Sequence, residues 1–289
     1  MLSKLIIGTV QFGLNYGITN TNGKTSKEDL DNIFNFCNQS NIKFFDTAQD
    51  YGNSEDILKE YKNKYSDMII ITKSKFKNKD INETINLSIN KFNKINYFLL
   101  HSFDDYTEQV IDKLIEYKKE NKIRKIGVSI YNVNEAKKLL KDNKIDIIQL
   151  PFNYLDKQWF DKEFQDLIKK NKVEIHVRSI FLQGILLNPI LENKKPINIS
   201  KEDFNYLNNI IDEISNEFKL SRLELCFAYI NSFEWIDKFL IGIDNYNHLL
   251  LNYEIIKKDL RLNRQQIQFI NDKVKDINPL ICCPLEWKF

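Results

Sequence analysis

Residues 43–52 read KFFDTAQDYG, a short apolar run that ends at Asp46 and continues into a polar loop carrying Tyr51. Two further apolar runs are built in the same way, because MIIIT leads into Lys73 and YFLL leads into His101. Short runs rich in β-branched and aromatic residues are typical of buried strands. Three consecutive runs that each end in an ionisable group indicate strands whose carboxyl ends meet at one place.

The rest of the chain continues this alternation of apolar runs with longer amphipathic segments, and no Pro/Gly/Ser-rich linker divides it. The expected strands are Leu5–Thr9, Lys43–Asp46, Met68–Lys73, Tyr97–His101, Lys125–Ser129, Ile145–Gln149, Val173–Arg178 and Lys238–Ile241. Apolar residues at helical spacing mark the segments Lys27–Gln39, Ile81–Phe92, Thr107–Asn121 and Asn134–Leu140. Ser26 or Thr25 is expected to cap the first helix, and Asn134 the last of these.

Eight strands, most of them followed by a helical segment, predict an α/β fold of the (β/α)8 TIM barrel type. We expect residues 1–289 to form one domain, with an inserted loop over Asn188–Ile199 and an extra C-terminal helix over Asn263–Ile277 followed by a tail. The alternative is an open doubly wound sheet. In a parallel barrel, chemistry takes place at the carboxyl ends of the strands, where the ionisable residues stand.

The composition is that of an ordinary globular protein, with 42 basic and 40 acidic residues and a net charge of +2. This balance predicts neither nucleic acid nor a membrane surface as a partner. Cys37, Cys226, Cys282 and Cys283 lack the spacing of a metal site, so we expect reduced thiols and no metal. The apolar run near the N-terminus is too short for a secretion signal, which predicts a cytoplasmic protein.

The four ionisable groups form a chemically coherent set. A phenol has a pKa near 10 and is a poor acid at neutral pH, so a neighbouring ammonium is expected to lower the pKa of Tyr51. A carboxylate beside Lys73 would hold that ammonium in place, and the imidazole of His101 would orient a substrate oxygen. Such a set polarises a carbonyl group and delivers a proton to its oxygen.

FDTAQDYG, followed by ITKS and LLHS in this order, resembles the signature of the aldo-keto reductase superfamily, and the correspondence runs from Gly8 to about Asn252. The resemblance implies a (β/α)8 barrel that uses NAD or NADP, with Asp46, Tyr51, Lys73 and His101 as the catalytic tetrad. It further implies a set of cofactor-binding residues along the remaining strand ends. These are Gly8, Thr9, Ser129, Gln149, Asn153, Arg178, Ser179, Phe181, Leu182, Gly184, Gly242, Asp244 and Asn252.

Three positions depart from what the resemblance implies. Ile130 follows Ser129 where many relatives have asparagine, and Arg178 stands where the family often has an aromatic ring stacked on the nicotinamide. Asp244 stands where NADPH-specific relatives have a basic residue. A carboxylate repels a 2′-phosphate and accepts a hydrogen bond from a 2′-hydroxyl, so we expect a weakened preference for NADP and treat NAD as a candidate.

The sequence therefore predicts an oxidoreductase that reduces an aldehyde or ketone, with Tyr51 as general acid. The stretch VRSIFLQG and the tail NPLICCPLEW resemble reductase-like proteins of bacterial surface-carbohydrate synthesis, which is compatible with a sugar-derived carbonyl. Two alternatives are a cofactor-binding regulatory subunit on the same scaffold and a carbohydrate-processing enzyme that recycles bound NAD. Trp159 is a candidate wall of the substrate site, His176 a packing residue and His248 a surface residue. The oligomeric state is left open.

Overall fold

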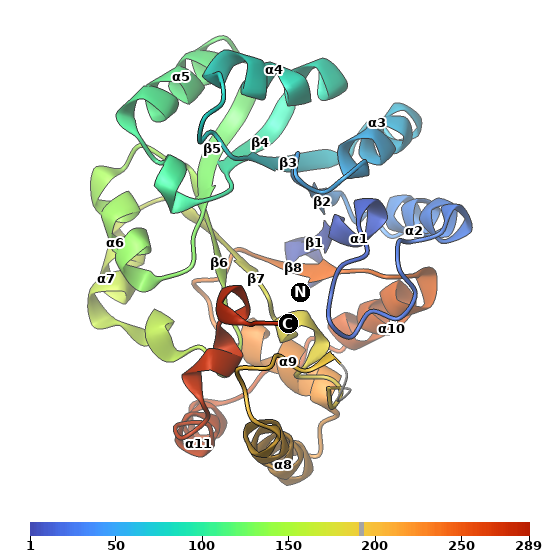
Figure 1. Ribbon diagram of the computed structural model, residues 1–289, viewed down its shortest axis with the longest axis vertical. Coiled ribbons are helices and arrows are strands. Elements are labelled where there is room, and N and C mark those ends of the chain that lie inside the picture. The colour runs from blue at the N-terminus through green and yellow to red at the C-terminus, as the bar shows by residue number, and fades with distance from the viewer. Residues whose placement is uncertain (191–193) are drawn as a thin grey trace.

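The computed structural model describes residues 1–190 and 194–289. In these residues eight parallel strands close into a barrel in chain order, surrounded by helices (Figure 1). Closure is made by β1 and β8, which pair with Ile7 opposite Ile241, and it rules out the open sheet. The strands are β1 (Leu5–Gly8), β2 (Phe44–Asp46), β3 (Ile69–Ser74), β4 (Ile95–Leu100), β5 (Ile123–Ser129), β6 (Ile147–Pro151), β7 (Glu174–Arg178) and β8 (Lys238–Gly242). The predicted barrel is confirmed.

Except for α1 and α3, the helices of the described residues begin with a side chain that caps them. Ser26 caps α2 by accepting from the Asp29 amide, as expected. The predicted cap Asn134 is wrong, because Asn132 caps α6 and forms a reciprocal capping box with Glu135. The helices are α1 (Val10–Gly13), α2 (Lys27–Gln39), α3 (Ser54–Lys64), α4 (Ile81–Phe92), α5 (Glu108–Lys119), α6 (Val133–Asp142), α7 (Lys162–Lys170), α8 (Lys201–Phe218), α9 (Arg222–Asn231), α10 (Tyr246–Lys257) and α11 (Arg264–Lys273).

Two apolar clusters fill the fold. The larger one lies between the strands and the helices. The smaller one fills the inside of the barrel, where the side chains that point inward come from every second residue of a strand. Its buried members are Ile6, Ile71, Tyr97, Leu99 and Ile147. His176 is fully buried with its ring 6.0 Å from that of Tyr97, which confirms its interpretation as a packing residue.

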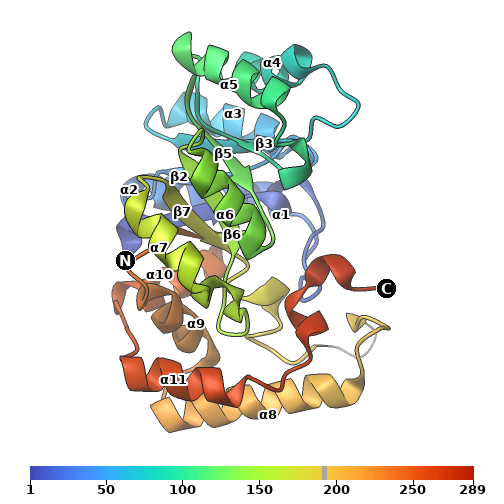
Figure 2. The same cartoon turned by 90° about the vertical axis from the view of Figure 1, so that its left-hand side faces the viewer.

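The C-terminal segment adds the predicted extra helix and tail. Figure 2 shows α11 alongside α8, with the tail then running toward the side of the barrel on which α1 lies. The rings of Phe218 and Phe269 are 5.5 Å apart between these helices. The amide of Ile197 donates to the Lys288 carbonyl at 2.7 Å, which joins the tail to the predicted loop Asn188–Ile199. Residues 191–193 of that loop lie outside the described residues.

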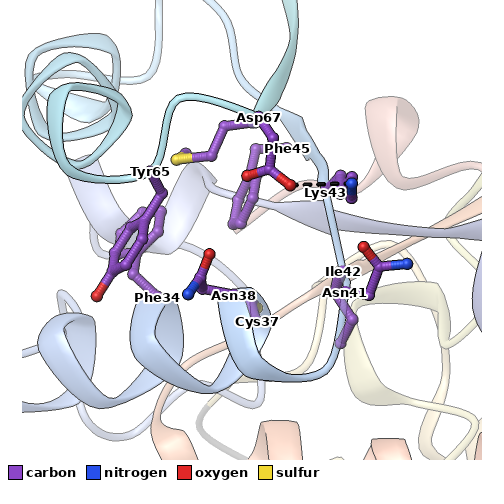
Figure 3. A pocket seen from close by; sticks show the side chains of 10 residues that line it. Phe34, Cys37, Asn38, Asn41, Ile42, Lys43, Phe45, Tyr65 and Asp67 are labelled. Atoms are coloured by element: carbon purple, nitrogen blue, oxygen red, sulfur yellow. Dashed lines mark ion pairs between the residues drawn. The ribbon is translucent and has the colours of Figure 1, made fainter.

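A small cavity lies between α2 and β2 (Figure 3). Its volume is about 10 Å³, which is room for a single water molecule. The ion pair between Lys43 and Asp67, at 2.9 Å, closes one side, and the buried thiol of Cys37 lies on another. It is therefore a packing gap and not a ligand site. All four cysteines are free thiols, as expected.

Two glycines let the loop after β2 approach the loop after β1. A Cβ atom on Gly13 would lie 1.8 Å from the carbonyl oxygen of Tyr51. Gly52 has a φ of +56°, and its Cβ would lie 2.5 Å from the Gly13 carbonyl oxygen. Larger side chains at either position would push the two loops apart and displace Tyr51.

We predict that Gly13→Ala lowers the free energy of unfolding by about 2 kcal/mol or more, because the added methyl group overlaps a backbone oxygen. Urea unfolding measures the change. Gly23→Ala serves as the comparison, since Gly23 has a φ of +75° with open space around its Cβ and should lose only about 1 kcal/mol. Equal losses in the two variants would contradict the proposed crowding.

Candidate active site

The loop that carries Tyr51 is held by backbone hydrogen bonds that extend the sheet beyond β2. The amide of Thr47 donates to the carbonyl of Ile71 at 2.8 Å, and the amide of Gln49 donates to that of Lys73 at 2.9 Å. The side chain of Gln49 donates to the carbonyl oxygen of Thr84 on α4 at 2.7 Å. The loop is thus tied to β3 and α4 before the chain turns at Tyr51 and enters α3.

The ionisable groups occupy the next inward-facing layer of the barrel. Ile71 belongs to the apolar cluster inside the barrel and is paired with Asp46 across the β2–β3 ladder. Lys73 lies two residues after Ile71, so its side chain also points inward. The same spacing relates His101 to Leu99 and Arg178 to His176. The interior of the barrel is therefore apolar along the strands and becomes polar at the mouth of the barrel, where the carboxyl ends of the strands lie.

Asp46 and Lys73 form a buried ion pair. Their side chains are 3% and 2% exposed, and the Lys73 ammonium donates directly to the Asp46 carboxylate. The second carboxylate oxygen accepts from Nε2 of Gln149 at 2.8 Å. A buried charge needs such partners, because desolvation of an isolated ion costs several kcal/mol. Gln149, expected to contact the cofactor, thus also holds Asp46.

Tyr51 and His101 lie beside this pair. The Lys73 ammonium is 5.3 Å from the centre of the Tyr51 ring. The rings of Tyr51 and His101 are 5.6 Å apart and meet edge to face at 77°. The four predicted catalytic residues therefore converge, and all of them border one cavity of about 860 Å³.

The expected lowering of the Tyr51 pKa is wrong, because the net shift is upward. Burial raises the pKa of the Tyr51 phenol above its usual value of 10, and the Asp46 carboxylate raises it further. Burial lowers the pKa of Lys73, while the carboxylate of Asp46 opposes that effect. The guanidinium of Arg178 acts in the opposite direction on the Tyr51 pKa, but burial outweighs it. Tyr51 is a neutral phenol that keeps its proton.

His101 is also neutral. Burial lowers its pKa to about 3, and the nearby ammonium of Lys73 acts in the same direction. Its Nδ1 atom lies 3.7 Å from the Asp50 carboxylate and has no hydrogen-bond partner in the part of the chain that the structure describes. A neutral imidazole donates one hydrogen bond and accepts another, which suits it to orient a substrate oxygen.

Most of the predicted cofactor residues border the same cavity. Those that do are Gly8, Thr9, Ser129, Gln149, Arg178, Ser179, Phe181, Gly184, Gly242, Asp244 and Asn252. Asn153 and Leu182 are buried away from it. The side-chain amide of Asn153 donates to the Ser179 carbonyl oxygen at 3.2 Å, so Asn153 supports the wall of the cavity. Trp159 is fully buried and does not border the cavity, because its indole lies in the core and donates to Asp156.

The cavity also has lining residues that the sequence did not reveal. Gln11, Tyr16, Tyr131, Arg222 and His248 are among them. Gln11 and Tyr131 follow closely after β1 and β5, so the rule that chemistry lies after strand ends could have found them. Tyr16 lies in a loop and Arg222 begins α9, where no local motif marks a contribution to a site. His248 is half exposed, as expected.

A closed parallel barrel with a polar cluster and a large cavity at its carboxyl mouth is the architecture of barrel enzymes. The aldo/keto reductase family model matches residues 4–275. The chain belongs to this family, whose members are oxidoreductases acting on carbonyl groups and generally use NAD(P)H. No curated protein sequence matches the chain significantly.

Solved structures share the fold. The chain is 21% identical to the holo form of an aldo-keto reductase from Bacillus halodurans, with 93% of this chain and 91% of that chain covered and a TM-score of 0.73. It is 16% identical to a glycerol dehydrogenase from Gluconobacter oxydans, with coverage of 96% and 92% and a TM-score of 0.73. No helix in the described residues has the length and apolar character needed to cross a membrane.

The three histidines give a pH prediction. Burial lowers the pKa of His101 and of His176, whereas the carboxylate of Asp244 raises that of His248 above 6.5. Imidazole NMR signals should therefore show only His248 titrating between about pH 6 and 8. Asp244→Asn should lower the His248 midpoint and leave the other two unchanged. A His101 midpoint near 6.5 would contradict this account.

The lowered pKa of His101 also affects the stability of the fold. In the unfolded chain His101 binds a proton near pH 6.5, whereas in the folded chain it stays neutral down to a pKa of about 3. The unfolded state then binds more protons as the pH falls below 6.5, so the free energy of unfolding should decrease. Urea unfolding between pH 7 and 4 tests this, and His101→Gln should show a smaller decrease than the unaltered protein.

Proposed function

We propose that the protein reduces an aldehyde or ketone at the barrel mouth, with Tyr51 as the general acid. The observation that carries the proposal is the convergence of a neutral phenol, a neutral imidazole and a buried Asp46–Lys73 pair on one cavity. Membership in the aldo/keto reductase family supports it.

Each residue of the tetrad has a distinct part in the proposed reaction. The Tyr51 hydroxyl donates a hydrogen bond to the carbonyl oxygen and transfers its proton as negative charge develops there. His101 orders the same oxygen by donating a second hydrogen bond. The Lys73 ammonium stabilises the phenolate that remains, and Asp46 keeps that ammonium charged and in position. Because its pKa is raised, the Tyr51 phenol carries its proton throughout the physiological range, so the proton is present when the substrate binds.

The residues along the cavity fit a dinucleotide cofactor. Three buried amide oxygens in it have no hydrogen-bond partner among the described residues: Oε1 of Gln149, Oε1 of Gln11 and Oδ1 of Asn252. Gln149 lies at the tetrad and would accept from a carboxamide, while Asn252 lies on α10 and would accept from an adenine amino group. When bound, a reduced nicotinamide supplies the hydride for the reaction.

The residues near Asp244 favour NAD. The Asp244 carboxylate lies 3.4 Å from Nδ1 of His248, and both border the cavity. Arg222 also borders the cavity, but its guanidinium donates to the Asp212 carboxylate at 2.7 Å and to the Asn208 side chain. Both basic groups already have anionic or polar partners, so neither is available to balance a 2′-phosphate.

The cytoplasmic location of the protein and its organisation as a single domain stay predictions.

We predict that Tyr51→Phe lowers kcat by about 1000-fold or more, because the variant lacks the proton that stabilises the developing alkoxide. Steady-state reduction of a panel of aldehydes measures kcat, and fluorescence titration measures the Kd for NADH, which should change by less than about threefold. Tyr65→Phe is the matched control, since Tyr65 lies at the small cavity beside α2. Full turnover by Tyr51→Phe would refute the mechanism.

Cofactor choice is tested separately. We predict that the protein binds NADH more tightly than NADPH, and that Asp244→Asn tightens NADPH binding by about tenfold by removing a repelling charge. Titration with both cofactors measures this. Asp272→Asn makes the same charge change on α11, outside the cavity, and should leave both Kd values unaltered. Tighter NADPH binding by the unaltered protein would show that Asp244 does not select the cofactor.

A further inference from the structure

Arg178 ends β7 and points into the mouth of the barrel beside the tetrad. Its guanidinium carbon lies 4.3 Å from the centre of the Tyr131 ring, so one face of the group is covered. Its Nη2 atom donates to the Ile130 carbonyl oxygen at 3.1 Å, and Nη1 donates to the Ser179 hydroxyl at 3.3 Å. The guanidinium is thus held in one orientation by three neighbouring residues.

The guanidinium of Arg178 still has N–H donors that no described residue uses. A guanidinium has five N–H donors, and these contacts use two of them. In residues 1–190 and 194–289, Arg178 forms no ion pair with a carboxylate. The buried carboxylate of Asp156 accepts instead from Trp159 at 2.9 Å and from Gln158 at 3.0 Å. Further N–H donors and one face of Arg178 are therefore free for a ligand.

The charges at the mouth do not cancel. Asp46 and Lys73 neutralise each other, and Tyr51 and His101 are uncharged. Asp50 is paired with Lys75 at 3.2 Å. Arg178 is therefore a positive charge without an ion-pair partner among the described residues, and it borders the same partly buried cavity as the proton donor, where charges are poorly screened. A charge of +1 is matched by a monoanion, and the planar fork of a guanidinium matches a carboxylate.

We infer that the substrate is a carbonyl compound that also carries a carboxylate, and that Arg178 binds this carboxylate while Tyr51 meets the carbonyl oxygen. The inference rests on the proposed function and specifies its substrate class. It is compatible with a nicotinamide nearby, because the open face of the guanidinium can stack on a ring while its edge binds the carboxylate. Arg178 then selects the substrate and Tyr51 carries out the proton transfer.

The test compares substrates that differ only in charge. The three carboxybenzaldehyde isomers are paired with the three neutral formylbenzamides, and the ratio of kcat/KM within each pair is measured. The isomers vary the separation between the carbonyl and the carboxylate. We expect the ratio to favour the acid by about 10-fold or more for at least one pair, as a charge-assisted hydrogen bond would give. A ratio near one for all pairs overturns the inference.

Substitution of Arg178 assigns the selectivity to that residue. Arg178→Met should lower the acid-to-amide ratio by about 10- to 100-fold, and Arg178→Lys should retain part of it, because lysine keeps the charge but loses the fork. Lys75→Met removes a positive charge at the exposed ion pair with Asp50 and should change the ratio by less than about twofold. An unchanged ratio in Arg178→Met, with or without weaker cofactor binding, overturns the inference.

A binding measurement separates this inference from the proposed reaction. Calorimetry with 4-(hydroxymethyl)benzoate and 4-(hydroxymethyl)benzamide, with NADH present and absent, requires no turnover. Tighter binding of the benzoate that is lost in Arg178→Met supports the carboxylate site even if no aldehyde is reduced, in which case only the proposed reaction fails. Equal binding of the two probes, together with reduction of neutral aldehydes, overturns the inference and leaves the reaction standing. Preference for glyceraldehyde 3-phosphate over every carboxylate would also overturn it.

Discussion

The buried ion pair between Asp46 and Lys73 is the constraint on which the site depends. Two nearly unexposed charges at the top of the barrel interior are tolerated only because each is the partner of the other and Gln149 donates to the remaining carboxylate oxygen. The pair also links β2 and β3 to β6 across the barrel. The position of Tyr51 follows, since its loop starts at Asp46 and is tied to the backbone of Lys73.

The pair also sets the electrostatics of its surroundings. Burial raises the pKa of the Tyr51 phenol and Asp46 adds to this effect, while burial lowers the pKa of the His101 imidazole and Lys73 adds to that effect, so both groups stay uncharged. A site built in this way holds its acid in the neutral form and stabilises negative charge only when that charge appears. The guanidinium of Arg178, in contrast, carries a positive charge that no neighbouring carboxylate of the described residues pairs with. Tyr131 and the Ile130 carbonyl hold this guanidinium in its orientation.

The barrel geometry explains why so much of the site could be read from the sequence. Inward-facing positions recur every two residues, and the interior changes from Ile71 to Lys73, from Leu99 to His101 and from Ile147 to Gln149 within one such step. The change from apolar to polar at the end of each run is a local feature, visible without knowledge of the fold. The family resemblance was less accurate for Asn153 and Leu182, which it implied as cofactor-binding residues but which are buried and do not border the cavity.

The sequence pattern alone was thus enough to predict the eight strands, their parallel arrangement and the four ionisable groups at their ends. This was possible because the periodicity of a strand and the residues at its end depend only on near neighbours in the chain. Long-range packing decided the rest. The protonation state of Tyr51 depends on burial and on the nearby carboxylate of Asp46. The cavity walls at Tyr16 and Arg222 come from segments distant in sequence. Burial and charge balance are sums over the whole neighbourhood, so they exist only once the chain has folded.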